Sequence, residues 1–552
     1  MTSRRLLPPI AFALLLFACH SASGVDTRIR AVRPPFAPPV AQWNHEWSRG
    51  AVFYEIFVRS FSDSGVDGIG DFKGLIARLD YLNDGDPATH TDLGIDAIWL
   101  MPVFESPSYH GYDATDYETI AKDYGTNADF QRFLDEAHKR GIHVIIDLVM
   151  NHTSSQHPWF LDSASSPASA KRNWYIWSAT NPGWQQPWGG DQTWHQLPPL
   201  SGMFYYGVFW SGMPDLNYRT PEVQAEMFRI ARYWLGLGVD GFRLDATRYL
   251  VETGPGPGQA DTAETHQLLK EFAADVRRTR PEATLVAENT TDTVALARYY
   301  GSTATIRGGD EMPSNFNFPL ASAVLDGVRN GTASRITSTL RTIISAYPSG
   351  VIDAPFLTNH DQTRLATVLG NDPGKLRNAA AILLTLPGAP FLYYGEEVGL
   401  QNGPGSADES KRTPMPWTSQ GGFTTGTRPW HEYAPGLAAN NVASQTSDAR
   451  SLLSYYRNWI AARKGSGGLL KGDMALLETG SQLLAFIRES PEERVLVVHN
   501  VSDSPANAAA IAVSANGFET IFADPGVSAP SGTSGAWKVT MPARSSGAWR
   551  IR

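Results

Sequence analysis

Cysteine is nearly absent from this chain of 552 residues, because Cys19 is the only one, so disulfide bonds play no part in its stability. An extended basic tract is also missing, and the formal net charge is −9. Nucleic acid and anionic membrane surfaces are therefore excluded as main partners. Aromatic residues, in contrast, are plentiful, with 16 Trp, 20 Tyr and 24 Phe, and we expect most of them to pack in cores.

The N-terminus has the composition of a targeting segment. Arg4 and Arg5 form a positive region, and the apolar run from Ala11 to Ala18 is too short to span a bilayer as a mature helix. Cys19 follows directly, and the junction resembles the bacterial lipoprotein processing box, in which the cysteine is acylated. The alternative is simple secretion, with cleavage near residues 21–24. We expect an exported bacterial protein, either a periplasmic or membrane-anchored lipoprotein with Cys19 lipidated, or a secreted one.

Strand-like and helix-like runs alternate from residue 48 onward. Helices are expected near residues 72–82 and 128–140, the second ending at Gly141. The expected strands are apolar runs at residues 51–58, 97–103, 143–149, 241–244, 285–287, 315–320, 356–358 and 390–394. Continuous apolar strands that alternate with helices are typical of a parallel sheet. The pattern predicts an α/β fold, a (β/α)8 TIM barrel with insertions.

The largest insertion, residues 152–217, is irregular and rich in tryptophan, proline and glycine. Its tryptophans are Trp159, Trp174, Trp177, Trp184, Trp188, Trp194 and Trp210. A long irregular excursion inside a compact domain is usually functional or disordered, and this tryptophan density argues against disorder. We interpret the insertion as a subdomain that forms one wall of a cleft. Most of its indoles should form its own core, and one or two should stack on a ligand.

The pattern changes after residue 465 to short strands between turn residues, which predicts an antiparallel β-sandwich. A stiff, extended spacer is expected from Pro34, Pro35, Pro38 and Pro39. The expected divisions are 1–24 signal or lipoprotein segment, 25–47 linker, 48–151 first part of the barrel, 152–217 insertion subdomain (domain B), 218–465 second part of the barrel and 466–552 C-terminal sandwich.

Four segments place a charged or polar group just past apolar, strand-forming residues. They are residues 143–152, 241–246, 285–289 and 356–361, and they supply Asp245, Glu288 and Asp361 together with His152, Arg243 and His360. A (β/α)8 barrel carries its chemistry at the C-terminal ends of its strands. Three carboxylates delivered there, with two histidines and an arginine, predict a site that cleaves a glycosidic bond.

Glycoside hydrolysis needs one carboxylate as nucleophile or base and one carboxylic acid that protonates the leaving oxygen. Asp245 lies two residues after Arg243, whose guanidinium favours the ionised aspartate that a nucleophile requires. Glu288 follows three small or apolar residues, and we expect partial burial or a like charge to raise its pKa so that it carries a proton. Asp361 can supply that like charge.

These segments resemble the signature regions of the α-amylase family of glycoside hydrolases, family 13, over about residues 48–465. The resemblance implies that Asp245 is the nucleophile, Glu288 the general acid/base and Asp361 the transition-state stabiliser of a retaining enzyme. The substrate-binding residues that it implies are His110, Tyr112, Asp113, His152, Arg243, His360 and Arg364. In retaining enzymes the two reacting carboxyl groups lie about 5–5.5 Å apart.

The segment from Met213 to Asn217 is similar to a fifth region of that family. Its Met-Pro-Asp-Leu-Asn form is similar to a subgroup between oligo-1,6-glucosidases and neopullulanases, which includes bacterial α-amylases, some of them lipoproteins.

A glycine-rich acidic loop runs from Asp63 to Asp71. Carboxylates at every fourth position can wrap a Ca2+ ion through oxygen ligands, and related enzymes carry a similar loop. The candidate ligands are Asp63, Asp67, Ile69 and Asp71. The alternative is an Asp/Gly-rich turn that is held by its own hydrogen bonds.

We expect an α-amylase that cuts internal α-1,4 bonds in starch, maltodextrins or maltooligosaccharides, and that acts as a monomer. An exo-acting α-glucosidase, an oligo-1,6-glucosidase or a glucosyl-transferring enzyme is the alternative. In related α-glucosidases the residues that match Asp113 and Arg364 can pair and close the pocket, but endo-acting members carry similar residues, so the pair does not decide. A sugar-binding protein without activity is a third possibility. The presence of all three carboxylates argues against it.

Overall fold

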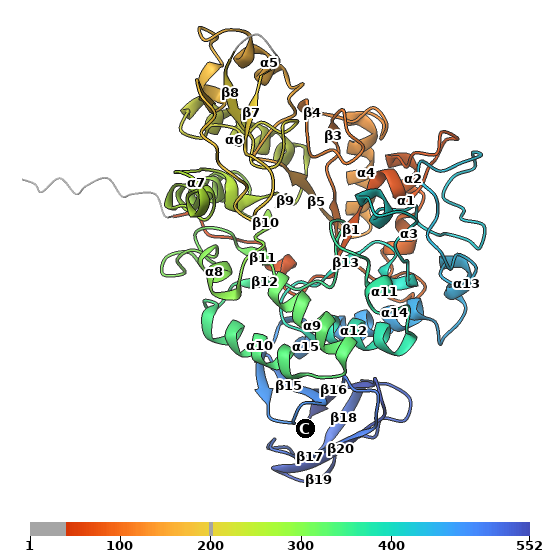
Figure 1. Ribbon diagram of the computed structural model, residues 1–552. Helices are drawn as coiled ribbons and strands as arrows, with labels where there is room; N and C mark the ends of the chain where they lie inside the picture. The colour runs from red at the N-terminus through yellow and green to blue at the C-terminus, as the bar shows by residue number, and fades with distance from the viewer. Residues whose placement is uncertain (1–39, 198–201) are drawn as a thin grey trace, which may run out of the picture. The chain divides into compact units, whose positions relative to one another are not determined.

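Eight parallel strands form a closed barrel in this computed structural model, which describes residues 40–197 and 202–552 (Figure 1). The strands are β1 (Phe53–Ile56), β2 (Ala97–Leu100), β5 (His143–Leu148), β9 (Gly241–Leu244), β10 (Thr284–Ala287), β11 (Ser314–Phe316), β12 (Ile352–Ala354) and β13 (Phe391–Tyr393). They pair in the order β12-β11-β10-β9-β5-β2-β1-β13. The ring closes where Phe356, just past β12, pairs in parallel with Phe391 of β13. The TIM barrel is thus confirmed.

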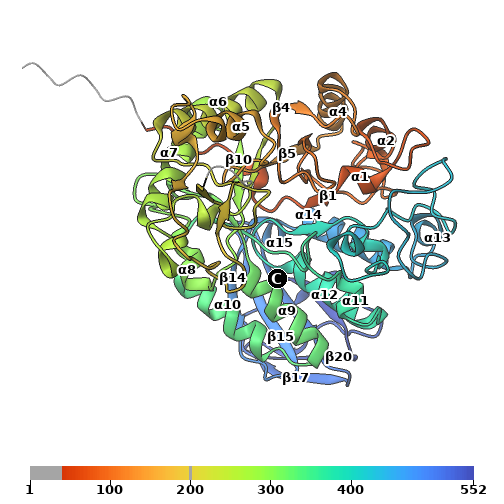
Figure 2. The same ribbon diagram turned by 45° about the horizontal axis from the view of Figure 1, so that its top comes forward.

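Helices surround the barrel, as Figure 2 shows for α4, α6, α7, α8, α10 and α12. Those that cover it or follow it are α1 (Val58–Phe61), α2 (Phe72–Ile76), α3 (Leu79–Leu82), α4 (Asn127–Lys139), α6 (Pro221–Leu237), α7 (Ala263–Thr279), α8 (Thr293–Arg298), α9 (Phe318–Asn330), α10 (Ser334–Ala346), α11 (Leu365–Val368), α12 (Pro373–Thr385), α13 (Val442–Thr446), α14 (Leu452–Lys464) and α15 (Gly467–Lys471). Each of the longer helices buries an apolar face. In α4 that face includes Phe130 and Leu134, and a capping box of Thr126 and Asp129 starts the helix.

Aromatic side chains fill the interior of the barrel. Phe53 of β1 stacks on Phe391 of β13 with ring centroids 4.3 Å apart, and Phe316 and Trp99 pack beside them. All four side chains are at most 4% exposed. The interior is therefore a packed core, as is usual for this fold, whose chemistry takes place beyond the C-terminal ends of the strands.

Two barrel strands differ from the sequence prediction. The seventh was expected at residues 356–358, but it lies at Ile352–Ala354, where the buried Asp353 breaks the apolar pattern and accepts a hydrogen bond from Asn317 at 2.9 Å. The sixth was expected to run to residue 320, but it ends at Phe316. Asn317 caps helix α9 by accepting from the N–H of Leu320, so the apolar residues that follow are helical.

Other predicted elements are in place and differ at their ends. The strands expected at 51–58 and 97–103 stop at Ile56 and Leu100, and the helix expected at 72–82 is divided into α2 and α3. These differences reflect loop residues that are as apolar as the strands they extend.

The insertion contains more regular structure than expected. It holds α5 (Pro158–Ser165) and a three-stranded antiparallel sheet of β6 (Trp177–Ser178), β8 (Phe204–Tyr206) and β7 (Trp194–Gln196). Trp174 and Trp194 are buried, as predicted for a core of its own, whereas Trp188 and Trp210 are 50% and 51% exposed. Figure 1 shows this subdomain above the barrel strands, next to the short hairpin of β3 (Phe104–Glu105) and β4 (Asp116–Ile120).

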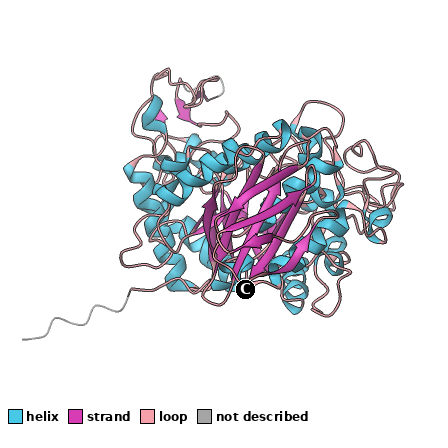
Figure 3. Cartoon of the chain, turned by 90° about the horizontal axis from the view of Figure 1, so that it is seen from below, coloured by secondary structure: helices cyan, strands magenta, loops and turns pink. Residues whose placement is uncertain are grey.

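The C-terminal part is an antiparallel β domain, as predicted. One sheet contains β14 (Asp473–Leu477), β15 (Leu483–Glu489), β16 (Arg494–Asn500), β21 (Ser546–Ile551) and β18 (Phe518–Ala523), and the other contains β17 (Ala506–Ile511), β20 (Ala536–Met541) and β19 (Ser531–Thr533). Figure 3 shows these strands around the C-terminus. The first sheet packs on α12 and α14, where His499 pairs with Thr385 at 2.9 Å.

Among the helices in the described ranges, none combines the length and the apolar composition that a membrane crossing requires. The predicted signal or lipoprotein segment with Cys19 and most of the predicted linker lie outside the described residues. Both stay predictions.

Candidate active site

The C-terminal ends of the barrel strands bring charged side chains to one end of the barrel. Glu55 lies on β1, Asp147 on β5 and Arg243 on β9, while Asp245 follows β9, Glu288 follows β10 and Asp361 lies beyond β12. The register places Leu244 opposite both Ala287 and Leu148, so the residues that follow these strands start from the same level.

Strand β9 can approach its neighbour only because it begins with a glycine. Gly241 has φ +149°, and a Cβ atom built on it would lie 1.9 Å from the carbonyl oxygen of Thr284 in β10. No other residue fits this contact without moving one strand. Gly241 therefore sets the position of Arg243, two residues further on.

Arg243 is the centre of the site. Its side chain is buried, and its Nη1 donates to Asp147 Oδ2 at 2.9 Å and to Asp245 Oδ1 at 2.6 Å. Its Nη2 lies 2.8 Å from Glu288 Oε2. One planar guanidinium thus binds three carboxyl groups and holds Asp245 and Glu288 beside each other.

The backbone also contributes to this arrangement. Ala246, directly after Asp245, has a left-handed conformation with φ +51°. Its N–H donates to Glu288 Oε2 at 3.1 Å. A non-glycine residue in this region costs roughly 1–2 kcal/mol, and such strain is commonly found at functional sites.

The three carboxyl groups around Arg243 differ from free carboxyl groups in their pKa. Burial raises the pKa of Glu288 to about 7, although Arg243 opposes this effect, and the charge of Asp245 adds to it. Burial also raises the pKa of Asp147 to about 6 and that of Asp245, again against Arg243. Glu288 can therefore carry a proton near neutral pH, as a general acid must.

Asp361 is held by two cationic groups. Its Oδ2 lies 3.1 Å from His360 Nε2, and its Oδ1 accepts from Arg412 Nη2 at 2.9 Å. Burial opposes ionisation, but His360 and then Arg412 outweigh it, so the pKa of Asp361 stays below its usual range. Asp361 is therefore the firmly ionised carboxylate of the site.

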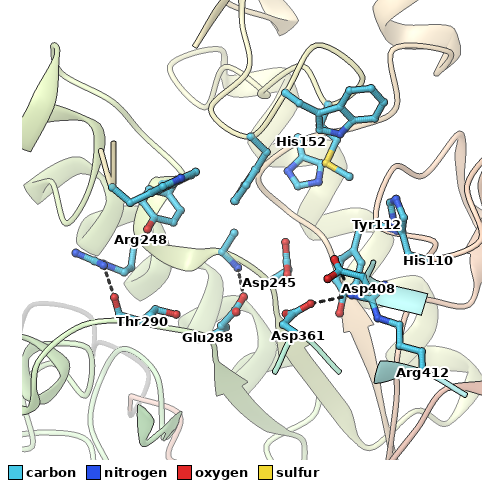
Figure 4. A pocket seen from close by; sticks show the side chains of 16 residues that line it. His110, Tyr112, His152, Asp245, Arg248, Glu288, Thr290, Asp361, Asp408 and Arg412 are labelled. Carbon is cyan, nitrogen blue, oxygen red and sulfur yellow. Dashed lines mark hydrogen bonds and ion pairs between the residues drawn. The ribbon is translucent and has the colours of Figure 1, made fainter. Parts of the chain in front are cut away.

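A cavity of about 550 Å3 opens over these carboxyl groups (Figure 4). Its lining residues are His110, Tyr112, His152, Trp188, Phe209, Trp210, Met213, Asp245, Ala246, Arg248, Tyr249, Glu288, Thr290, Asp361, Asp408 and Arg412. Rings of the insertion meet Tyr249 from the barrel, since Trp188 lies 5.4 Å from Tyr249 and 5.6 Å from Phe209. Figure 4 shows Arg248 and Thr290 at one end of the cavity and Asp408 and Arg412 at the other.

Six of the predicted site residues line this cavity: Asp245, Glu288, Asp361, His110, Tyr112 and His152. Arg243 and His360 are not among the lining residues and bind its carboxylates through their side chains. His152 is buried, and its Nε2 has no hydrogen-bond partner among the described residues. Burial lowers the pKa of His152 to about 3, so the ring is neutral and can bind a hydroxyl group.

Asp113 and Arg364 are not brought together. Asp113 Oδ1 accepts from Ser106 Oγ at 2.8 Å, while Arg364 donates to the carbonyl oxygens of Lys411 and Tyr394 at 2.7 and 2.8 Å. Neither residue belongs to the cavity lining. The geometry therefore gives no support to the predicted substrate contacts of this pair.

Sequence reasoning missed several groups of the site. Glu55 and Asp147 lie inside buried strands, and a carboxylate within an apolar run was a visible signal for both. Arg412 and Asp408 come from a turn around a 3-10 helix (Asp408–Lys411) far along the chain, and no local pattern indicated them.

The predicted calcium loop is held by its own hydrogen bonds. Its carboxylates accept backbone N–H groups, Asp63 from Gly65 and Gly68, Asp67 from Ile69, and Asp71 from Ser64 and Gly74. Within residues 40–197 and 202–552, no group of three or more His, Cys, Asp and Glu side chains is arranged to hold a metal ion. These contacts match the Asp/Gly-rich turn, and calcium stays a prediction.

A TIM barrel with three carboxyl groups at its strand ends, one of them holding a proton near neutral pH, defines a glycoside hydrolase site. Comparison with known proteins gives the particular family. The family profile "Alpha amylase, catalytic domain" matches residues 55–472. "Alpha-amylase 3" of Dictyoglomus thermophilum is 39% identical over 466 residues, 83% of this chain and 86% of that protein.

Other relatives carry different names. "Trehalose synthase/amylase TreS" of Mycolicibacterium smegmatis is 35% identical, over 83% of this chain and 85% of that protein. The crystal structure of an α-amylase from H. orenii superposes with a TM-score of 0.79 at 38% identity, over 92% of this chain and 100% of that one. The chain belongs to the α-amylase family of glycoside hydrolases, family 13.

Proposed function

We propose that the protein is a retaining α-amylase that cleaves α-1,4-glucosidic bonds in starch, maltodextrins or maltooligosaccharides through a covalent glycosyl-enzyme. One observation carries the proposal: Asp245 and Glu288 are bound to the same guanidinium, beneath a cavity that extends to both sides of them. Retention requires two carboxyl groups close enough for one to attack the sugar directly.

Asp245 is the nucleophile in this proposal. Its carboxylate attacks the anomeric carbon, and the bond to Arg243 at 2.6 Å favours the ionised form that attack requires. The same contact holds the carboxylate in one orientation, which lowers the entropic cost of the attack.

Glu288 is the general acid in the first step and the general base in the second. It donates its proton to the leaving glycosidic oxygen, and it then accepts a proton from the water that attacks the glycosyl-enzyme. A pKa raised to about 7 by burial suits both roles, because either form is accessible near neutral pH.

Asp361 stabilises the positive charge that develops on the sugar ring. Its carboxylate is ionised and faces the cavity with 47% of its side chain accessible. His110, Tyr112 and His152 surround the same space and supply hydroxyl contacts and a ring face for the reacting glucose.

The leaving part of the chain lies on the side of Arg248 and Thr290. Glu288 must face the leaving oxygen, and Figure 4 shows Arg248 and Thr290 beyond Glu288, whereas Asp408 and Arg412 lie beyond Asp361. On the leaving side the rings of Trp188 and Tyr249 offer apolar faces for further glucose units.

A second candidate is an exo-acting α-glucosidase or a glucosyl-transferring enzyme. Arg412 favours it, because this side chain bonds Asp361 at 2.9 Å and lies 3.6 Å from Asp408, at the end of the cavity where the non-reducing end of a glucan would continue. Relatives named α-glucosidase and trehalose synthase are compatible with this reading.

Digestion of maltoheptaose distinguishes the two. An α-amylase releases maltose and longer fragments from the first minutes, whereas glucose as the only early product would refute the endo-acting proposal. Polarimetry of the first product tests retention separately, since a retaining enzyme releases the α-anomer.

Replacement of the nucleophile tests the assignment of roles. Asp245→Ala should lower kcat by on the order of 10⁴-fold while the circular dichroism spectrum and Tm remain close to the parent values. Activity within tenfold of the parent would show that Asp245 does not form the covalent bond.

A further inference from the structure

A fourth carboxylate, Glu55, lies behind the active site in strand β1. Its residue is 2% exposed, and β1 is paired on both sides, with β2 and with β13. Glu55 is not among the residues that line the cavity, and its Oε1 lies 2.5 Å from Nδ1 of His360. Glu55 is therefore placed behind the substrate space, and the site residue that it bonds among the described residues is the imidazole of His360.

The other side of that imidazole faces the reaction. Nε2 of His360 lies 2.6 Å from the hydroxyl of Tyr112 and 3.1 Å from Oδ2 of Asp361. The ring is stacked on Tyr112 at 5.5 Å and meets the edge of Trp99 at 5.6 Å. An imidazole with a carboxylate at each nitrogen carries a proton on both, and its ring plane is fixed.

We propose that Glu55 is a positioning residue of the reaction, which holds His360 as an imidazolium and thereby orients Asp361 and Tyr112 toward the reacting sugar. The carboxylate of Glu55 anchors Nδ1–H, and this bond selects the ring orientation in which Nε2 lies 2.6 Å from the Tyr112 hydroxyl and 3.1 Å from Asp361 Oδ2. The inference rests on the proposed function, because it assigns Glu55 to the same reaction.

The charges around His360 favour the cationic ring. Glu55 from β1 and Asp361 beside it supply carboxylates, and Asp147 from β5 is a further carboxyl group. Burial raises the pKa of Glu55, and His360 opposes this effect. Arg412, which donates to the His360 carbonyl, and Arg243, 3.4 Å from the Tyr112 hydroxyl, are the opposing cations. Burial lowers the pKa of His360, but Asp361 and Glu55 outweigh it and raise it to about 9. When the Glu55 carboxylate is removed, less negative charge opposes the effect of burial on His360. The pKa of His360 therefore falls, and the ring loses its proton at lower pH.

Glu55→Gln removes the charge and keeps the size and a hydrogen-bond acceptor. We expect kcat on maltoheptaose to fall about 10- to 100-fold, because small misplacement of groups at the reacting sugar costs rate, with KM changed less than threefold. Glu288 sets the first alkaline limb of the kcat profile near pH 7, so loss of the His360 proton adds a second, steeper limb at higher pH. This second alkaline limb should move to lower pH by about one unit in the variant. If activity falls but the alkaline limbs of the kcat profile stay at the same pH, Glu55 has only a structural role and the proposal is overturned.

Glu397→Gln is the matched control. Glu397 is equally buried, and it accepts hydrogen bonds from Tyr54 and Tyr81 at 2.8 and 2.5 Å instead of from His360. The same substitution there should lower Tm without moving the pH limbs. An equal shift of the second alkaline limb in this variant would show that any buried charge produces the effect, and would also overturn the proposal.

A double-mutant cycle with His360→Gln asks whether Glu55 acts through the imidazole. In the His360→Gln background, Glu55→Gln should lower kcat less than twofold further, whereas independent effects would multiply. If Glu55→Gln does not fold, Glu55→Asp replaces it in the cycle, since the shorter side chain withdraws the carboxylate from Nδ1. Equal losses in both backgrounds contradict the proposal. A parent enzyme without activity on maltooligosaccharides would instead refute the proposed function.

Discussion

The buried guanidinium of Arg243 positions the reactive carboxyl groups and also affects their pKa values. Three carboxyl groups share Arg243, so their charges repel one another while burial penalises each ion. The sequence predicted the pairing of Arg243 with Asp245, because the two lie two residues apart at the end of one short strand. It did not predict the contributions of Asp147 and Arg412, since burial and contacts between distant loops are not encoded in local pattern.

The pKa of Glu288 gives a prediction for pH dependence. The protonated form is the active acid and its pKa is raised to about 7, so kcat/KM should fall about tenfold per unit above pH 7. In Glu288→Gln this alkaline limb should vanish together with most of the activity. A substrate whose leaving group needs no proton, such as α-maltosyl fluoride, should retain far more activity in that variant. An equal loss on both substrates would contradict the role of Glu288 as acid.

At the scale of elements, the barrel strands could be predicted where they are uniformly apolar, and β9 and β10 lie where the pattern placed them. Strand β12 could not be predicted, because the buried Asp353 interrupts its apolar pattern. The apolar residues 356–358, which follow the strand and lead to the site residues, were predicted as the strand instead. The insertion was recognised from its tryptophans, but its strands of two or three residues are too short to show a hydrophobic periodicity.

The close contact between β9 and β10 predicts a large effect of one methyl group. Gly241→Ala should destabilise the protein by about 3 kcal/mol or more, because the new Cβ would lie 1.9 Å from Thr284 O at a φ that L residues avoid. Gly236→Ala in α6 is the control, with no atom near its Cβ, and should stabilise by about 0.5–1 kcal/mol. Urea midpoints measure both. Similar midpoints for the two variants would contradict the proposed strand contact.

The loop from Asp63 to Asp71 offers a second prediction at this scale. If it binds calcium, Tm should rise with added Ca2+ and fall with EDTA in the parent protein, and Asp67→Asn should abolish this response. Asp67 is the informative position because, among the described residues, its carboxylate accepts one backbone N–H, that of Ile69, so its loss disturbs the turn least. A Tm that is unaffected by either reagent favours the turn held by hydrogen bonds alone.

For the whole molecule, the order of parts could be predicted because each has its own pattern: a barrel, an insertion of aromatic residues and an antiparallel sheet domain. How these parts pack could not, since contacts such as Arg488 with the carbonyl oxygens of Thr385 and Gly472 join segments far apart in sequence. For the same reason, the sequence could not show that Asp113 and Arg364 bond to other residues and not to each other.

Lipidation of Cys19 would attach the whole molecule to a membrane, and this prediction can be tested. When the chain is expressed in a bacterium fed radiolabelled palmitate, the parent protein should carry label and sediment with membranes. Cys19→Ser should carry none and should appear in the soluble fraction. Unlabelled parent protein would support the alternative of simple secretion.

The two half-exposed tryptophans at the cavity provide the protein with an optical reporter. Trp188 and Trp210 are about half exposed, and the others of its 16 tryptophans are buried or partly buried, so a polar quencher such as acrylamide reaches these two preferentially. A sugar chain lying over them shields their emission and shifts it to shorter wavelength. Occupancy of the cleft can thus be followed by intrinsic fluorescence in the inactive Asp245→Ala variant, without a label and without turnover.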